Sequence, residues 1–281
     1  MDFSENLFLL EADQNCYATP AFNYSDIWEF QAIVEAAQEE RARVYVASNM
    51  RVANSIGLPY LGALGQMAYQ QTGGCIYNHL DHSSSVELCK KAVDCGYMSV
   101  MIDASMDSLE ENIRKAREVT EYAHAHGVLV EAEIGRILGR NEEGNFHGDD
   151  FLVQTENAVL LAEQTHVDSL AIGIGTAHGF YKEEPHINIQ RLKEVNAAVQ
   201  IPLVLHGGTG VPAETIRACI ENGMAKVNVG TQLHATYIET LRKRLAEYEG
   251  TNISDLMEPV REEIKEVVKK WIRICGANNR V

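Results

Sequence analysis

Long hydrophobic runs, close cysteine pairs and clusters of basic residues are all missing from this sequence of 281 residues. It contains 40 Asp and Glu against 24 Lys and Arg, a net charge of −16, so a nucleic acid is not an expected partner. The opening segment MDFSENLFLLEADQN has early acids and a short apolar run, which predicts neither a signal peptide nor a membrane span. We therefore expect a cytoplasmic protein without a membrane partner. Its six cysteines form no CxxC pair, and we interpret them as free thiols.

The apolar segments that are present repeat along the whole chain. Eight runs rich in β-branched residues predict strands, at residues 17–23, 43–48, 74–82, 98–105, 128–135, 169–179, 201–210 and 225–231. Segments with apolar residues three or four apart lie between most of these runs and predict helices, as does the stretch 236–281. Continuously apolar strands are buried on both faces, as in parallel sheets. We therefore predict one domain over residues 1–281, a (β/α)8 TIM barrel with extra C-terminal helices. The alternative is an open doubly wound sheet, but no GxGxxG follows the first strand.

Reactive side chains gather at the carboxyl ends of the predicted strands, where barrels of this kind build their active sites. Three of these ends carry His82, His178 and His206. Three imidazoles with an open fourth position form the ligand set of a catalytic zinc, and cobalt or iron would also fit. We interpret His79 as a hydrogen-bonded core residue. The remaining histidines lack this placement and are expected to be structural or exposed: His124, His126, His147, His166, His186 and His234.

Glycines follow the last three predicted strands. Loops seven and eight of a barrel commonly bind phosphate through backbone amides, and threonine hydroxyls and a lysine would add donors. The pattern therefore predicts a phosphorylated substrate beside the metal. The expected contacts in these loops are Gly179, Lys182, Gly207, Gly208, Thr209, Gly230 and Thr231. Polar residues at other strand ends, Asn23, Ser48 and Asn228, complete the predicted substrate-binding set.

Six ordered motifs resemble one known family. They are HLDH (79–82), VMIDAS (100–105), VEAEIG (130–135), GTAHGFYK (175–182), PLVLHGGTG (202–210) and KVNVGT (226–231). In this order they resemble the metal-dependent class II ketose-bisphosphate aldolases, which include fructose- and tagatose-bisphosphate enzymes. The resemblance covers nearly the whole chain, from PAFN near the start to the helix KEVVKKWIRICG at the end.

The resemblance implies roles for the strand-end residues. His82, His178 and His206 would hold one Zn²⁺, and Asp81 would be the proton donor and acceptor. Asp103 and Glu133 would lie near the metal as alternative or outer ligands. The loops after strands six, seven and eight would hold the dihydroxyacetone phosphate half of the substrate, with a monovalent cation, Na⁺ or K⁺, nearby in many members.

Some positions depart from the family pattern. Many members have glycine at Ser83, serine at Thr209 and an acid at Gln232, and fructose-specific members have acids at both 230 and 232. Gly230 is more like the tagatose-type members, which weakens a fructose-bisphosphate assignment. After strand five the run GRILGRNEEGNFHG is irregular, and both Glu142 and Glu143 are candidates for the acid that handles the C3 proton.

The sequence thus predicts zinc-dependent, reversible cleavage of a ketose 1,6-bisphosphate into dihydroxyacetone phosphate and glyceraldehyde 3-phosphate. A lysine Schiff base has no good candidate, because strand six lacks lysine and Lys226 stands at the wrong end of strand eight. The alternatives are a lyase or epimerase of the same scaffold that acts on a longer or non-phosphorylated sugar, and a non-catalytic barrel subunit. A homodimer or homotetramer is expected.

Overall fold

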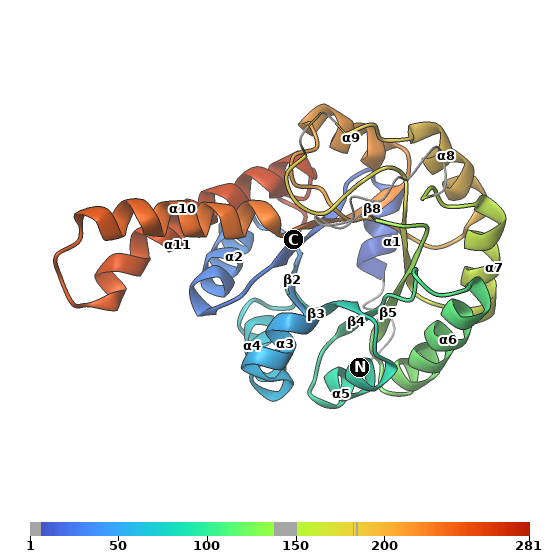
Figure 1. Ribbon diagram of the computed structural model, residues 1–281, viewed down its shortest axis with the longest axis horizontal. Coiled ribbons are helices and arrows are strands. Elements are labelled where there is room, and N and C mark those ends of the chain that lie inside the picture. Colours follow the sequence, from blue (N-terminus) through green and yellow to red (C-terminus); the bar gives the residue numbers. More distant parts are fainter. Residues whose placement is uncertain (1–6, 138–150, 182, 184) are drawn as a thin grey trace.

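The computed structural model describes residues 7–137, 151–181, 183 and 185–281, and its centre is a closed barrel of parallel strands (Figure 1). The strands are β1 Thr19–Asn23, β2 Val44–Asn49, β3 Ile76–Ser83, β4 Ser99–Ile102, β5 Leu129–Ile134, β6 Ser169–Ile172, β7 Leu203–Leu205 and β8 Met224–Val229. Each strand pairs in parallel with the next, and β8 pairs with β1. The predicted (β/α)8 barrel is confirmed, and the open doubly wound alternative is wrong.

Helices alternate with the strands and cover the outside of the barrel (Figure 1). Those predicted from apolar spacing are α2 Ile27–Glu39, α5 Val86–Asp94, α6 Leu109–Ala125, α7 Thr155–Thr165, α8 Ile189–Ala198 and α9 Ala213–Glu221. Several begin at a side chain that accepts hydrogen bonds from the first free backbone N–H groups, as Asp26, Ser85 and Ser108 do.

Two further helices between β2 and β3 had no clear apolar signal. These are α3 Met50–Ile56, capped by Asn49, and α4 Leu58–Gln71. Gly57, with φ of 102°, separates them, and Pro59 lies in the first turn of α4. The interruption divides the segment into two short helices, so neither shows a long amphipathic pattern.

The amino-terminal end of the barrel is closed by α1 Leu7–Gln14. Its Phe8 packs against Tyr45 and Tyr77, with ring centroids 5.5 and 4.5 Å apart. This aromatic cluster fills one end of the barrel, so an open site can form only at the other end.

The C-terminal helices α10 Thr231–Glu247 and α11 Ile253–Ile274 form a hairpin that projects from the barrel (Figure 1). Helix α11 packs on α2, and Lys265 and Lys269 of α11 form ion pairs with Glu39 of α2. The predicted C-terminal helices are therefore confirmed. Across the described parts of the chain, no helix is both long enough and apolar enough to cross a bilayer.

Alternate residues of three strands place polar side chains in two layers inside the barrel. Residues i and i+2 of a strand share a face. The pairs are His79 and Asp81 on β3, Glu131 and Glu133 on β5, and Lys226 and Asn228 on β8. The upper layer opens toward the carboxyl ends of the strands, and the lower layer lies beneath it.

Candidate metal centre and active site

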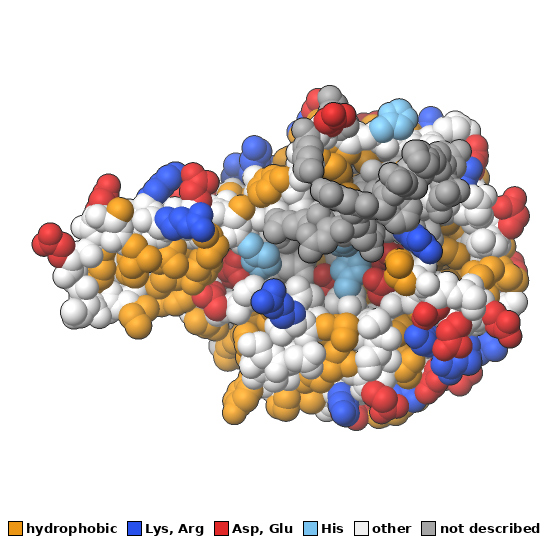
Figure 2. All heavy atoms as spheres, viewed as in Figure 1, with side chains coloured by type: hydrophobic (Ala, Val, Ile, Leu, Met, Phe, Trp, Pro, Cys, Tyr) orange, Lys and Arg blue, Asp and Glu red, His pale blue; other side chains and the backbone are white. Residues whose placement is uncertain are grey.

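A cavity of about 440 Å³ opens at the carboxyl ends of the strands. Figure 2 shows histidine and acidic side chains in the hollow at the centre of this face. The structure brings most of the predicted site residues together in its lining: Asn23, Asp81, His82, Asp103, Glu133, His178, Gly179, His206, Gly207, Gly208, Thr209, Asn228, Gly230 and Thr231.

Four predicted residues are not found in this lining. Ser48 is buried, and its hydroxyl lies 2.7 Å from the Tyr97 hydroxyl. Ser48 is not among the described residues that line the cavity. Its neighbour Asn49 lines the cavity instead. Lys182, Glu142 and Glu143 lie outside the described residues.

A backbone irregularity at the end of β3 brings two consecutive side chains to the same cavity. In a regular strand Asp81 and His82 would point to opposite faces. Here the pairing with β4 shifts register between Leu80 and Ser83, and His82 has φ of +47°. Such a bulge re-aims a side chain, and a positive φ is strained for a residue other than glycine. Asp81 and His82 therefore both line the cavity.

The carboxylate of Asp81 is held by two amides. Asn23 Nδ2 donates to Oδ2 at 2.7 Å, and Asn228 Nδ2 donates to Oδ1 at 3.1 Å. Burial alone would raise the pKa of Asp81, but the positive charges of His82 and Lys226 and the hydrogen bond from Asn23 lower it overall. Asp81 is therefore an ionised, oriented carboxylate in the cavity wall, able to accept a proton.

His82 is surrounded by carboxylates. Its Nδ1 lies 2.9 Å from Asp103 Oδ2 and 3.6 Å from Glu133 Oε2. Burial works to lower the pKa of His82, but the charge of Asp81, the hydrogen bond to Asp103 and the charge of Glu133 raise it to about 10. The surroundings thus favour positive charge at this point of the cavity.

The other ring nitrogen of His82 is buried and has no hydrogen-bond partner among the described residues. Oε2 of Glu133 is likewise buried and has no hydrogen bond within the described structure. Burial, followed by the charge of Asp103, raises the pKa of Glu133 to about 8. An imidazole nitrogen and a carboxylate oxygen that are buried without a hydrogen-bond partner can each offer a lone pair, which fits a site for a cation.

His206 has the opposite electrostatic character. Burial, followed by the charge of His82, lowers its pKa well below the usual value. Burial and His82 likewise lower the pKa of His178 to about 4. Neutral imidazoles keep a lone pair on one ring nitrogen, which is the form that binds a metal.

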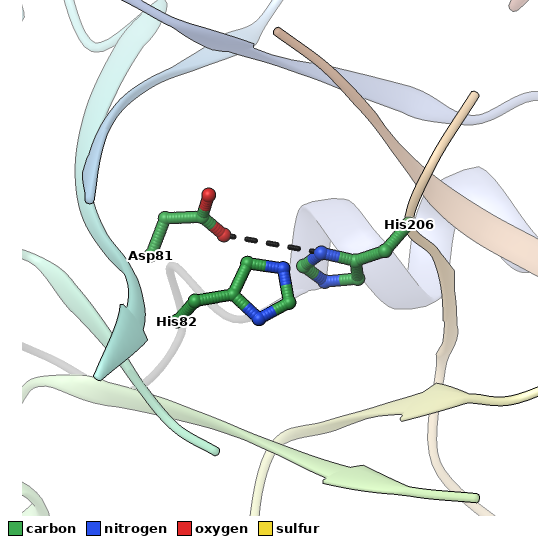
Figure 3. A group of neighbouring side chains, drawn as sticks. All are labelled: Asp81, His82 and His206. Atoms are coloured by element: carbon green, nitrogen blue, oxygen red, sulfur yellow. Dashed lines mark ion pairs between the residues drawn. The ribbon is translucent and has the colours of Figure 1, made fainter. Parts of the chain in front are cut away.

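Two groups of three residues could each hold a metal ion, because within each group the potential ligand atoms all lie within 4.8 Å of one another. The groups are Asp81, His82 and His206 (Figure 3), and His82, Asp103 and Glu133. His82 belongs to both groups. The His178 ring centroid lies 4.7 Å from that of His82 and 6.3 Å from that of His206. His178 therefore lines the same cavity, but no close ligand group among the described residues includes it. The donor types present, imidazole and carboxylate, fit a zinc ion.

The glycines after β7 allow the chain to pass close to its neighbours. Gly207 has φ of +69°, and a Cβ there would lie 2.4 Å from the backbone oxygen of Ala177. A Cβ on Gly208 would lie 3.1 Å from the backbone oxygen of Asn228, and Thr209 Oγ1 accepts from Gln232 N–H at 3.2 Å. The loops after β7 and β8 therefore form one packed, side-chain-poor wall of the cavity, as a phosphate-binding site requires.

The cavity lining also includes residues that the sequence did not assign to it, among them Arg136 and His234. Arg136 follows β5 and lines the cavity, but no strand-end signal marked it. His234, expected to be structural or exposed, also lines the cavity from the first turn of α10, while its Nδ1 lies 2.9 Å from the buried Glu29. The pairing of His234 with Glu29 joins residues 205 positions apart, which no local pattern reveals.

Comparison with known proteins agrees with this arrangement. A family model described as fructose-bisphosphate aldolase class-II matches residues 5–280. The crystal structure of the YdjI aldolase from Escherichia coli K12 is similar, with 26% identity, a TM-score of 0.84, and coverage of 98% of this chain and 97% of that one.

Two other solved structures are similar over nearly their whole length. A protein from Coccidioides immitis, assigned provisionally as a fructose-1,6-biphosphate aldolase, is 28% identical with a TM-score of 0.88, over 97% of this chain and 96% of that one. A fructose-bisphosphate aldolase from Campylobacter jejuni is 19% identical with a TM-score of 0.83, over 99% and 96% of the two chains. At 19% identity the likeness concerns the fold.

Proposed function

The chain belongs to the class-II fructose-bisphosphate aldolase family, and from this premise we propose that it is a zinc-dependent lyase. Its reaction is the reversible cleavage of a ketose 1,6-bisphosphate into dihydroxyacetone phosphate and glyceraldehyde 3-phosphate. The observation that carries the proposal is the meeting of Asp81, His82 and His206 in one cavity at the open end of the barrel.

The proposed ligands are His82, His178 and His206, with Asp103 and Glu133 as alternative or outer ligands. Zinc, when bound, supplies a Lewis acid that stabilises the negative charge developing on the C2 oxygen of the ketose, a contribution of several kcal/mol. The buried, unpartnered Nε2 of His82 and the lowered pKa values of His178 and His206 support this ligand set.

Asp81 is the proposed base for cleavage. Its carboxylate takes the proton of the C4 hydroxyl, the C3–C4 bond breaks, and the C4 carbonyl of the aldehyde forms while the bonding electrons stay on C3. In condensation Asp81 returns the proton to the new C4 oxygen. The hydrogen bonds from Asn23 and Asn228 support this role because they fix the carboxylate. Glu142 or Glu143 is proposed to protonate C3, and both lie outside the described residues.

The donor phosphate is assigned to the wall made by Gly207–Thr209 and Asn228–Thr231, together with Gly179 and Lys182. Arg136 adds a guanidinium to the cavity lining, and among the described residues no carboxylate forms an ion pair with it. A cation at the cavity wall supports an anionic substrate.

A longer acceptor is the second candidate. A hollow of about 580 Å³ shares Thr231 and His234 with the cavity and continues along α10 past Ile238 to Arg242. This hollow offers room for a sugar chain longer than glyceraldehyde 3-phosphate.

The proposal keeps residues 1–281 as one barrel domain that acts in the cytoplasm as a homodimer or homotetramer. Figure 2 shows hydrophobic side chains gathered along the projecting α10–α11 hairpin. Its exposed apolar residues include Ile238, Leu245 and Ile253. Such a surface supports self-association.

One experiment tests the reaction and identifies the acceptor. The zinc-loaded protein is incubated with dihydroxyacetone phosphate and a panel of aldehydes, including glyceraldehyde 3-phosphate, longer aldoses and non-phosphorylated sugars, and the products are identified by nuclear magnetic resonance. We expect a ketose 1,6-bisphosphate, and the configuration at C4 shows whether it is of the fructose or tagatose type. Condensation with none of the aldehydes would contradict the proposal.

A further inference from the structure

A chain of buried polar side chains runs beneath the proposed metal centre. Lys226 Nζ lies 2.6 Å from Glu131 Oε2, and Glu131 Oε1 lies 2.7 Å from His206 Nε2. On its other side Lys226 Nζ lies 3.3 Å from His79 Nε2, and His79 Nδ1 lies 2.8 Å from Ser99 Oγ. Lys226, Glu131 and His79 are each at most 1% exposed, and the described cavity lining includes none of them. Any effect of these three residues on the metal centre is therefore transmitted through His206.

The chemistry of the groups fixes where the protons lie. The ammonium of Lys226 can only donate, so His79 Nε2 accepts and the proton of that ring is on Nδ1, directed to Ser99. An ionised carboxylate can only accept, so Glu131 receives one hydrogen bond from Lys226 and one from His206 Nε2–H. The neutral ring of His206 therefore carries its lone pair on Nδ1.

That nitrogen faces the site. His206 Nδ1 lies 3.3 Å from Asn228 Nδ2 and 3.9 Å from Asp81 Oδ1, on the side where Asp81, His82 and His206 meet (Figure 3). Glu131 thus holds the proton of His206 on the nitrogen away from the other potential ligands.

Lys226 stabilises the buried carboxylate of Glu131 by forming an ion pair with it. A buried charge left without a partner is strongly unfavourable, whereas a paired and hydrogen-bonded one is accommodated. Lys226 supplies the opposite charge at 2.6 Å, and its own ammonium is completed by His79 and by the face of Tyr45, 4.9 Å from the ring centroid. Lys226 is thus an electrostatic partner of Glu131 within the barrel.

We propose that Glu131 and Lys226 are positioning residues that fix the tautomer of His206, so that Nδ1 is the atom offered to the metal. This inference rests on the proposed metal-dependent function. It assigns a role to a buried ion pair that touches neither the substrate nor the reacting atoms, and it explains why a lysine occupies the interior of this barrel.

The test is zinc affinity, measured by competition with a chromophoric chelator on folded protein. In Glu131→Gln the amide nitrogen can donate to His206 Nε2, which moves the imidazole proton to Nδ1. We expect zinc affinity to fall by roughly 10- to 100-fold, the usual effect of losing a partner that orients a metal ligand. The visible spectrum of the cobalt-loaded protein should change in the same variant, which a loss of stability alone would not cause.

A second variant covers the case in which Glu131→Gln does not fold, since it leaves the Lys226 charge unpaired. The double variant Glu131→Met with Lys226→Met removes both charges at similar volume, and because a methionine side chain does not accept a strong hydrogen bond from His206 Nε2–H, it should show a similar loss of zinc affinity. The matched control is Glu29→Gln, the same change at another buried glutamate that contacts a histidine outside the ligand set, and it should keep zinc affinity within about twofold of the parent.

The outcomes separate this inference from the proposed function. If the parent binds zinc tightly and the Glu131 variants bind it equally well with an unchanged cobalt spectrum, the positioning role is wrong and the proposed function stands. If the folded parent does not bind zinc, the proposed function fails and the positioning role fails with it.

Discussion

Replacing Asp81 by alanine should separate two proton transfers that the proposed reaction requires. Asp81 is assigned to the C4 oxygen, whereas exchange of the C3 proton of dihydroxyacetone phosphate needs the metal and a loop glutamate. Asp81 is only 4% exposed, and its carboxylate is fixed by hydrogen bonds of 2.7 and 3.1 Å from Asn23 and Asn228, the geometry of a positioned base. Asp81→Ala should therefore lower cleavage and condensation by roughly 100- to 10,000-fold, or about 2.7 to 5.4 kcal/mol in the barrier.

The assay compares two rates in the same sample. Cleavage of the ketose is followed by coupled product detection, and deuterium exchange at C3 of dihydroxyacetone phosphate is followed by nuclear magnetic resonance, with zinc content checked in each variant. Asp81→Ala should keep the exchange, while His206→Ala, which removes a proposed ligand, should lose both reactions. Asn23→Ala keeps the carboxylate and loses one charge-assisted hydrogen bond, so cleavage should fall by only about tenfold. An Asp81→Ala protein that retains zinc but no longer exchanges the C3 proton would show that the proposed division of labour is wrong.

Three further changes test other parts of the account. Gly208→Val should raise KM for dihydroxyacetone phosphate with little change in zinc content, since even its Cβ would lie 3.1 Å from the backbone oxygen of Asn228. If the parent protein used free dihydroxyacetone as well as its phosphate ester, the proposed phosphate site would be wrong. Arg136→Met should raise KM for the bisphosphate by roughly tenfold or more, through loss of a charge-assisted contact, and Arg136→Lys should recover part of it; an unchanged KM in steady-state assays counts against this contact. Gly173→Ala should lower the free energy of unfolding by about 1 to 3 kcal/mol, because its Cβ would lie 2.7 Å from Arg136 N and Phe151 O; an unshifted urea midpoint would contradict the crowding.

The residues that the sequence identified share one property: they stand where a strand ends. Asp81, His82 and His206 directly follow or end apolar runs, so the barrel topology brings them to the same end of the barrel, and the irregularity at the end of β3 then places His82 in the cavity beside Asp81. The closed order of the strands could be predicted for the same reason, since eight buried runs with helices between most of them leave few alternatives.

The residues whose placement could not be predicted from the sequence are those whose position depends on side-chain direction and on partners distant in the chain. Ser48 ends the predicted strand 43–48, but β2 extends to Asn49, and the Ser48 hydroxyl lies against Tyr97 rather than in the cavity. Lys226 was correctly kept away from the open end of the barrel, but its contact with Glu131, 95 positions earlier, depends on the register of the strands. A one-residue change of register reverses the direction of every side chain, and apolar spacing does not fix register to that accuracy.

The most direct test of the central claim is the dependence of carbon–carbon bond cleavage on a metal. Ketose-bisphosphate cleavage is measured before and after treatment with a chelator, after addition of zinc to the treated protein, and separately after borohydride in the presence of substrate. Because the described cavity offers imidazoles and carboxylates and contains no lysine, chelation should abolish cleavage, zinc should restore it, and borohydride should leave it intact. Cleavage that resists the chelator and is lost on borohydride treatment would contradict the account.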